Sequence, residues 1–113
     1  MGDVIVDLST HQAWLVAFYH RRHWDQYSPL IRLNFLTEEV GELSRAIRAL
    51  ELGRDHPGEP VPAKSALAAN LEEELADVLD QVLILSGQFE INPEQLLHAS
   101  ETKLKQRFSF EKD

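Results

Sequence analysis

Two short acidic motifs hold the residues of this chain that are most able to do chemistry. Glu38, Glu39 and Glu42 form the first motif, and Glu74 and Asp77 form the second. Acids three residues apart lie on one face of a helix. Two such pairs on packed helices would bring four carboxylates together, and these repel one another unless a cation lies among them. The motifs therefore indicate a site for a hard divalent cation.

The types of the neighbouring residues narrow the choice of metal. A di-iron bundle needs a histidine three residues after a glutamate on two of its helices. Neither Glu42 nor Glu74 is followed by one. Carboxylate ligands without histidine or cysteine favour Mg²⁺, with Mn²⁺ as a possible substitute. The competing interpretation is that glutamate is a good helix former and fills the flanks of amphipathic helices, which explains any single acid better than it explains two matching pairs.

Start and stop signals predict the helices that must position these acids. Ser9 with Gln12 offers a capping box, and Ser28-Pro29 and Asn92-Pro93 each combine an N-cap with proline at the first helical position. Gly53 is suited to a C-cap. These signals and the apolar periodicity predict helices over about 10–24, 29–52, 63–88 and 93–108.

The remaining segments set the architecture. Residues 1–8 are expected to form an extended arm, 54–62 a Pro/Gly-rich loop and 109–113 a polar tail. One long connection and two short ones between four helices indicate an all-α four-helix bundle. The chain has 113 residues, so we expect one domain over 1–113.

The apolar periodicity also predicts which way the acids face. The expected core positions are Leu33, Leu36, Val40, Leu43, Ile47 and Leu50 in the second helix, Leu67, Leu71, Leu75, Val78, Val82 and Leu85 in the third, and Leu96, Leu97 and Leu104 in the fourth. At about 100° per residue, Glu39 and Glu42 fall on the same side of their stripe as Glu74 and Asp77 do of theirs. Glu38 points to the opposite side.

Composition excludes several functional classes. The formal net charge of -8 argues against a general role in nucleic-acid binding. There is no cysteine, so neither a disulfide nor thiolate chemistry is available. No apolar run approaches the roughly 20 residues of a membrane span. Residues 1–8 contain two acids and no Lys or Arg, unlike a secretory signal. A cytoplasmic protein is the default expectation.

The two motifs together match a known family. Glu38-Glu39-x-x-Glu42 followed by Glu74-x-x-Asp77 resembles the EExxE…ExxD signature of the MazG-like all-α nucleoside triphosphate pyrophosphohydrolases, in particular their small single-domain members. Further similarities cover about residues 12–111: Trp24, Tyr27 and Pro29 before the first motif, Gln81 after the second, and Asn92, Lys103 and Arg107 in the C-terminal part.

The resemblance implies Mg²⁺-dependent hydrolysis of a nucleoside triphosphate between the α and β phosphates, in the service of nucleotide-pool housecleaning. It implies that Glu39, Glu42, Glu74 and Asp77 ligate the metal and that Glu38 is catalytic, holding a further ion or helping to activate water. Substrate contacts would come from Trp24, Gln81, Asn92, Lys103 and Arg107. The last two also suit the negative end of a helix without any ligand.

The resemblance further implies a homodimer or a homotetramer. Two other functions stay open at this point: a helical dimer that binds metal or nucleotide without turnover and regulates a partner, and a purely structural bundle. Phosphoribosyl-ATP pyrophosphatase shares the general helical design, but its pattern fits the C-terminal helix less well.

Overall fold

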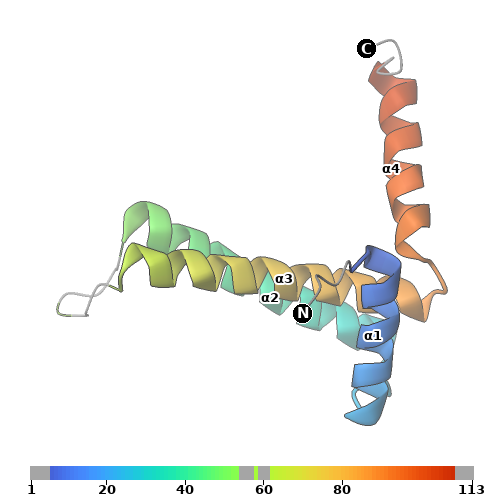
Figure 1. Cartoon of the computed structure of the whole chain (residues 1–113), viewed down its shortest axis with the longest axis horizontal. Coiled ribbons are helices and arrows are strands. Elements are labelled where there is room, and N and C mark those ends of the chain that lie inside the picture. The colour runs from blue at the N-terminus through green and yellow to red at the C-terminus, as the bar shows by residue number, and fades with distance from the viewer. Residues whose placement is uncertain (1–5, 54–57, 59–61, 109–113) are drawn as a thin grey trace, which may run out of the picture. The chain divides into compact units, whose positions relative to one another are not determined.

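The computed structural model describes residues 6–53, 58 and 62–108, and these residues form four helices and no strand (Figure 1). The helices are α1 (Leu8–Arg21), α2 (Pro29–Leu52), α3 (Lys64–Gln88) and α4 (Pro93–Phe108). The prediction of an all-α fold with four helices is confirmed. The predicted arm, loop and tail fall mostly or wholly outside the described residues, but Leu8 already belongs to α1. None of the described helices combines the length and the apolar character needed to cross a membrane.

The predicted caps of α2 and α4 are confirmed. The Ser28 side chain accepts a hydrogen bond from the Ile31 N–H at 3.3 Å, and Gly53 ends α2 with φ 80°, a conformation that glycine adopts without strain. At the start of α4, Asn92 Oδ1 accepts from the Gln95 N–H at 2.9 Å, and Gln95 Oε1 accepts from the Asn92 N–H at 2.8 Å. This reciprocal pair is a capping box.

The predicted start of α1 is wrong. The N-cap is Asp7, whose carboxylate accepts a hydrogen bond from the Thr10 N–H at 2.7 Å. This bond lowers the pKa of Asp7, and a carboxylate is favoured at the positive end of a helix. The Ser9 hydroxyl, which was expected to cap the helix, instead donates to the carboxylate of Glu94 at the start of α4.

The predicted end of α1 is also too late. The helix stops at Arg21, and His23 takes a left-handed conformation with φ 62°. The Trp24 N–H then returns to the Tyr19 carbonyl at 2.9 Å. A left-handed residue followed by such a returning bond is a common helix terminator. It leaves Trp24 outside the helix.

The chain comprises two compact units, and each is described by itself. The first contains residues 1–26 and 83–113, and the second contains residues 27–82. In the first unit, Leu15, Tyr19, Leu83 and Ile84 form the core, with Leu8 and Phe18 packed against it. The Gln12 side chain joins α1 to the end of α3, since its Nε2 lies 2.8 Å from the Leu83 carbonyl and 3.0 Å from Ser86 Oγ.

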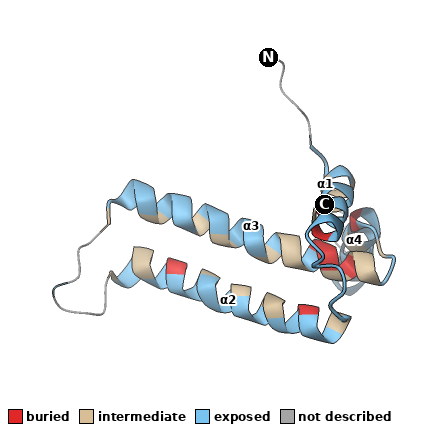
Figure 2. Cartoon of the chain, turned by 90° about the horizontal axis from the view of Figure 1, so that it is seen from below, coloured by how far each residue is buried: buried red, intermediate tan, exposed pale blue. Residues whose placement is uncertain are grey.

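In the second unit, α2 and the first part of α3 lie side by side (Figures 1 and 2). The buried and half-buried positions that define their facing sides are Arg32, Phe35, Leu36, Glu39, Leu43, Ala46, Ala49 and Leu50 on α2, and Leu67, Leu71, Glu74, Val78 and Gln81 on α3. These sides include Glu39 and Glu74, one acid from each predicted pair, whereas Glu42 and Asp77 are exposed.

The predicted apolar stripes are wrong in detail. Val40 is 48% exposed and Leu75 is 50% exposed, and Leu33, Ile47 and Val82 are also classed as exposed large hydrophobic residues. The facing sides keep half of each predicted stripe, and they are shifted from it toward Glu39 and Glu74. The retained positions are Leu36, Leu43 and Leu50 of α2 and Leu67, Leu71 and Val78 of α3. Each apolar band is wider than one neighbouring helix can cover. On α2, the small side chain of Ala46 permits α3 to approach closely. Leu97 and Leu104 of α4, predicted to be buried, are exposed as well.

Candidate metal centre

Three carboxylates from two helices meet in the second unit. Glu39 of α2 and Glu74 and Asp77 of α3 each offer an oxygen, and these oxygens lie within 4.8 Å of one another. Glu39 and Glu74 are half-buried, whereas Asp77 is exposed. The helical spacing of Glu74 and Asp77 places both on one face. Glu39 is on the side of α2 that faces α3, so its carboxylate meets theirs. Three of the four carboxylates that were predicted to meet thus lie together, and Glu42 is not in the group.

Burial and mutual repulsion favour the protonated forms of two carboxylates in the cluster. Burial raises the pKa of Glu39, and the negative charges of Asp77, Glu74, Glu42 and Glu38 raise it further, in that order of importance. Burial also raises the pKa of Glu74, with Asp77 and Glu42 as the main neighbouring charges. Each carboxylate would lose this penalty if a cation lay between them.

A divalent cation fits the residues that are present. Oε2 of Glu74 is buried and has no hydrogen-bond donor. An ionised oxygen left in this state costs free energy, because it has given up water without gaining a partner. A cation at the cluster would supply that partner. The donor set is entirely carboxylate oxygen, which suits Mg²⁺ or Mn²⁺.

The structure distinguishes the other two acids of the first motif. Glu42 is exposed and its Oε2 lies 3.6 Å from Nη1 of Arg45, so it lies outside the group of three. Glu42 nevertheless lines a small cavity together with Glu74, and its charge raises the pKa of both Glu39 and Glu74. Glu38 is exposed, and it is the weakest of the four acids that act on Glu39. This agrees with the expectation that Glu38 points away.

The residues predicted to contact substrate are divided between the units. Gln81 is half-buried, one turn after Asp77 on α3. The four others belong to the first unit. There, Trp24 packs edge-on against Phe18 and Tyr19, Asn92 caps α4, and Lys103 and Arg107 are exposed on α4. Substrate contact by these five residues stays a prediction.

Sequence reasoning missed three polar residues of the second unit. Arg32 is 3% exposed, and its guanidinium carbon lies 5.8 Å from the Tyr27 ring centroid and 5.4 Å from that of Phe35. It lies seven residues before Glu39, about two turns along the same face. That spacing was the signal that could have identified it. Arg45 and Asn70 line a small cavity beside the cluster, and only the packing of α2 on α3 reveals them.

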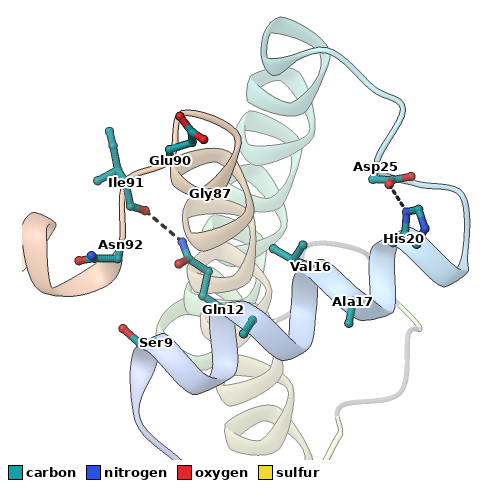
Figure 3. Close-up of a pocket in the computed structure, with 11 residues that line it drawn as sticks. Ser9, Gln12, Val16, Ala17, His20, Asp25, Gly87, Glu90, Ile91 and Asn92 are labelled. Atoms are coloured by element: carbon teal, nitrogen blue, oxygen red, sulfur yellow. Dashed lines mark hydrogen bonds and ion pairs between the residues drawn. The ribbon is translucent and has the colours of Figure 1, made fainter.

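A larger cavity lies within the first unit. It measures about 580 Å³ and is bordered by α1 and by the turn between α3 and α4 (Figure 3). Its floor is made by small apolar residues, including Val16 and Gly87, and its rim carries Glu90 and the His20–Asp25 pair, joined at 2.6 Å. No Lys or Arg is among its described lining residues. Two acids without a lysine or arginine are unfavourable for a triphosphate.

These features define a class: all-α proteins in which two neighbouring helices carry Glu-x-x-Glu and Glu-x-x-Asp motifs and form an acidic cluster able to bind a divalent cation. The MazG nucleotide pyrophosphohydrolase domain matches residues 28–109, and the chain belongs to this family.

Two relatives from Bacillus subtilis support the assignment. The chain is 39% identical over 103 residues to the uncharacterized protein YvdC, covering 91% of this chain and 97% of YvdC. It also resembles the crystal structure of YpjD, a protein provisionally described as a pyrophosphatase, with a TM-score of 0.63 and 26% identity. That match covers 96% of this chain and 98% of YpjD. The MazG-like fold is therefore confirmed.

The raised pKa values of Glu39 and Glu74 predict how stability varies with pH. Their folded pKa values lie above the ordinary value of 4.5, so the native state binds more protons than the unfolded state. In EDTA, this contribution to stability is present below pH 4.5 and is lost as pH rises through the folded pKa. Mg²⁺ at neutral pH should raise the melting temperature, because it binds the native cluster. Thermal melts across pH, with and without Mg²⁺, measure both effects.

A double variant, Glu39→Gln with Glu74→Gln, is the control for this pH dependence. It should flatten the fall in melting temperature above pH 4.5 and remove most of the response to Mg²⁺. Asp7 and Asp25 have lowered pKa values, so their opposite contribution lies below pH 3.8, outside this window. A wild-type fall in stability that the double variant leaves unchanged would contradict the assignment to the cluster.

Proposed function

We propose that the protein is a Mg²⁺-dependent nucleoside triphosphate pyrophosphohydrolase that forms a nucleoside monophosphate and pyrophosphate. The observation that carries this proposal is the convergence of Glu39, Glu74 and Asp77 in a chain of the MazG family. A triphosphate is strongly anionic, and an acidic cluster attracts it only through bound cations. Removal of unwanted or non-standard nucleotides is the physiological role that we propose.

The proposed reaction assigns a task to each carboxylate. Glu39, Glu74 and Asp77, joined by Glu42, would hold Mg²⁺. Bound there, Mg²⁺ neutralises charge on the phosphates. Water attacks the α phosphorus, the bond from this phosphorus to the bridging oxygen breaks, and pyrophosphate leaves with that oxygen and its bonding electrons. Glu38 is proposed as the carboxylate that accepts a proton from the attacking water, a role that requires hydrogen-bond reach.

Five further residues are proposed to hold the nucleotide. Lys103 and Arg107 are cations one turn apart on α4 and suit phosphate oxygens. Asn92 and Gln81 offer amide groups at the α4 N-terminus and on α3. Trp24 presents an aromatic ring suited to contact with an apolar part of the nucleotide. The support for these roles is the family to which the chain belongs and the chemistry of each side chain.

We also propose that two copies of the chain associate through the exposed apolar side of the second unit. Leu33, Val40 and Ile47 recur every seven residues on α2, and Leu75 and Val82 recur with the same spacing on α3. Seven-residue spacing is typical of helices that pack along one another. An uncovered apolar band on two neighbouring helices is unfavourable in water. A homodimer, or a homotetramer built from two dimers, would cover it.

A pyrophosphate-release screen tests the proposed function. We expect release from at least one of the canonical or damaged (deoxy)nucleoside triphosphates in Mg²⁺, the matching monophosphate as the second product, and no release in EDTA. Restoration by excess Mg²⁺ is the control for chelation. Binding of Mg²⁺ and nucleotide by calorimetry without turnover across the panel would instead support a regulatory binding protein.

A further inference from the structure

A second, smaller cavity adjoins the candidate metal centre within the second unit. It measures about 170 Å³ and lies between α2 and α3. Its lining includes Glu74, which belongs to the acidic cluster, and Glu42. Its volume is several times the roughly 30 Å³ of one water molecule, but below the ~300 Å³ at which sites for whole drug-sized ligands begin. The cavity is therefore sized for one planar ring system.

The lining divides the cavity into an apolar floor and a polar rim. Ala46, Ala49 and Leu67 make the floor, and Ala46 is 3% exposed. Arg45 and Asn70 are the rim residues other than the two acids, one from each helix. A phosphate group would bring its charge onto three apolar side chains, which is unfavourable. A flat ring with polar atoms along its edge matches both surfaces.

The hydrogen-bonding groups of the rim favour one class of ring edge. An arginine side chain carries only donors, so it pairs with carbonyl oxygens or ring nitrogens and opposes amino groups. An asparagine side chain carries both a donor and an acceptor and can pair with either a carbonyl or a ring N–H. Together they suit a ring that has a carbonyl oxygen beside an N–H, as uracil, thymine and guanine have.

Arg45 is connected to the metal centre through the same acids. Its Nη1 lies 3.6 Å from Glu42 Oε2, and its charge offsets a small part of the rise in the pKa of Glu74. Cations bound at the cluster would neutralise these two carboxylates and weaken their hold on the guanidinium. Arg45 would then be available to a ligand in the cavity. The side chain is exposed, so it can move without repacking the core.

We propose that this cavity holds the base of the substrate and that Arg45 and Asn70 make the enzyme prefer nucleotides with keto bases over those with amino bases. The inference rests on the proposed pyrophosphohydrolase function and names its substrate class. The preferred substrates carry uracil, thymine, guanine or their oxidised forms. Cytosine and adenine, which present an amino group at the corresponding edge, are disfavoured.

The first test compares kcat/KM for dUTP, dTTP and dGTP with kcat/KM for dCTP and dATP in Mg²⁺. We expect kcat/KM of the wild-type protein to be about tenfold or more higher for the three keto-base nucleotides than for dCTP and dATP. One hydrogen bond to a charged donor provides discrimination of this size. Arg45→Met removes the donors and keeps the apolar stem. It should reduce the keto-to-amino ratio by about tenfold. This ratio is insensitive to any change in metal affinity, because both substrate groups use the same cations.

Two further variants test the cavity itself. Asn70→Asp replaces a donor with an acceptor, so it should shift the preference toward cytosine and adenine. Ala49→Leu fills the floor of the cavity. It should weaken the binding of every nucleotide and leave the affinity for Mg²⁺, measured by calorimetry, unchanged. Arg48→Met is the matched control, since Arg48 lies three residues after Arg45 on α2 but does not line the cavity. Its keto-to-amino ratio should equal that of the wild type.

The outcomes separate this inference from the proposed function. Turnover with no keto preference, or a ratio that Arg45→Met and Asn70→Asp leave unchanged, would overturn the inference and leave the function standing. If no nucleotide is hydrolysed, the proposed function fails. Calorimetric binding of the α,β-methylene analogues of dUTP and dCTP then decides the inference. Tighter binding of the dUTP analogue, with a difference in affinity that disappears in Arg45→Met, supports it. Equal binding of the two analogues overturns it.

Discussion

Replacing Glu39 with glutamine is expected to reduce pyrophosphate release by about a thousandfold or more, because the change removes a charged oxygen ligand and retains the shape of the side chain. Asp77→Asn should have a similar effect from the other helix. Glu39 and Asp77 approach from α2 and α3, so each variant removes one side of the cluster. Initial rates in saturating Mg²⁺, with calorimetry for metal affinity, measure the loss.

Glu51→Gln on α2 and Glu72→Gln on α3 are the matched controls, because both acids are exposed and lie outside the cluster. Both should retain wild-type rates. Glu38→Gln separates catalysis from metal binding: a fall in kcat at unchanged Mg²⁺ affinity supports its proposed role with water. Wild-type turnover in both Glu39→Gln and Asp77→Asn, with helical circular dichroism unchanged, would contradict the proposed metal centre.

The sequence predicted the cluster well because both of its determinants are local. Three-residue spacing fixes which acids share a face, and this depends only on the helical repeat. The bounds of α2 and the start of α4 follow from Ser28-Pro29, Gly53 and Asn92-Pro93, whose capping chemistry is also local. The convergence of Glu39, Glu74 and Asp77 was therefore predictable once two neighbouring helices were expected, but the position of Glu42 outside this group was not.

The shift of the facing sides was not predictable in the same way. A periodic band of Leu, Val and Ile identifies an apolar side, but it does not say which of two neighbours covers each residue. Leu33, Val40 and Ile47 looked like core because they are apolar, whereas Ala46 faces α3 because it is small. The choice depends on close packing between helices, which is a tertiary property.

The start of α1 shows a second limit, which is competition between caps. Ser9 with Gln12 satisfied the capping-box pattern, but Asp7 supplies a charged acceptor two residues earlier. Gln12 instead donates to the Leu83 carbonyl, and Ser9 donates to Glu94. Both partners are more than 70 residues away in the chain. A local pattern cannot reveal that a side chain is used in a distant contact.

The exposed apolar side of α2 and α3 leads to the second large prediction. The wild-type protein should be a dimer or a larger assembly at micromolar concentration, and Val40→Glu should raise its dissociation constant at least a hundredfold. The substitution places a carboxylate in the centre of a band that also contains Leu33 and Ile47. Around a two-fold axis the same charge enters from both copies, so the penalty is doubled. Sedimentation velocity over a concentration series measures the change.

The matched control is Leu52→Glu, because Leu52 is an exposed apolar residue of α2 that lies off the seven-residue series. It should assemble like the wild type. Val40 is already half exposed in the single chain, so Val40→Glu should keep its helical content and its melting transition as a monomer. A wild-type protein that stays monomeric at a concentration about 100 times higher than that used in the activity assay would contradict the proposed interface. So would a Val40→Glu variant that assembles normally, because a carboxylate is not tolerated in a closely packed apolar contact between helices.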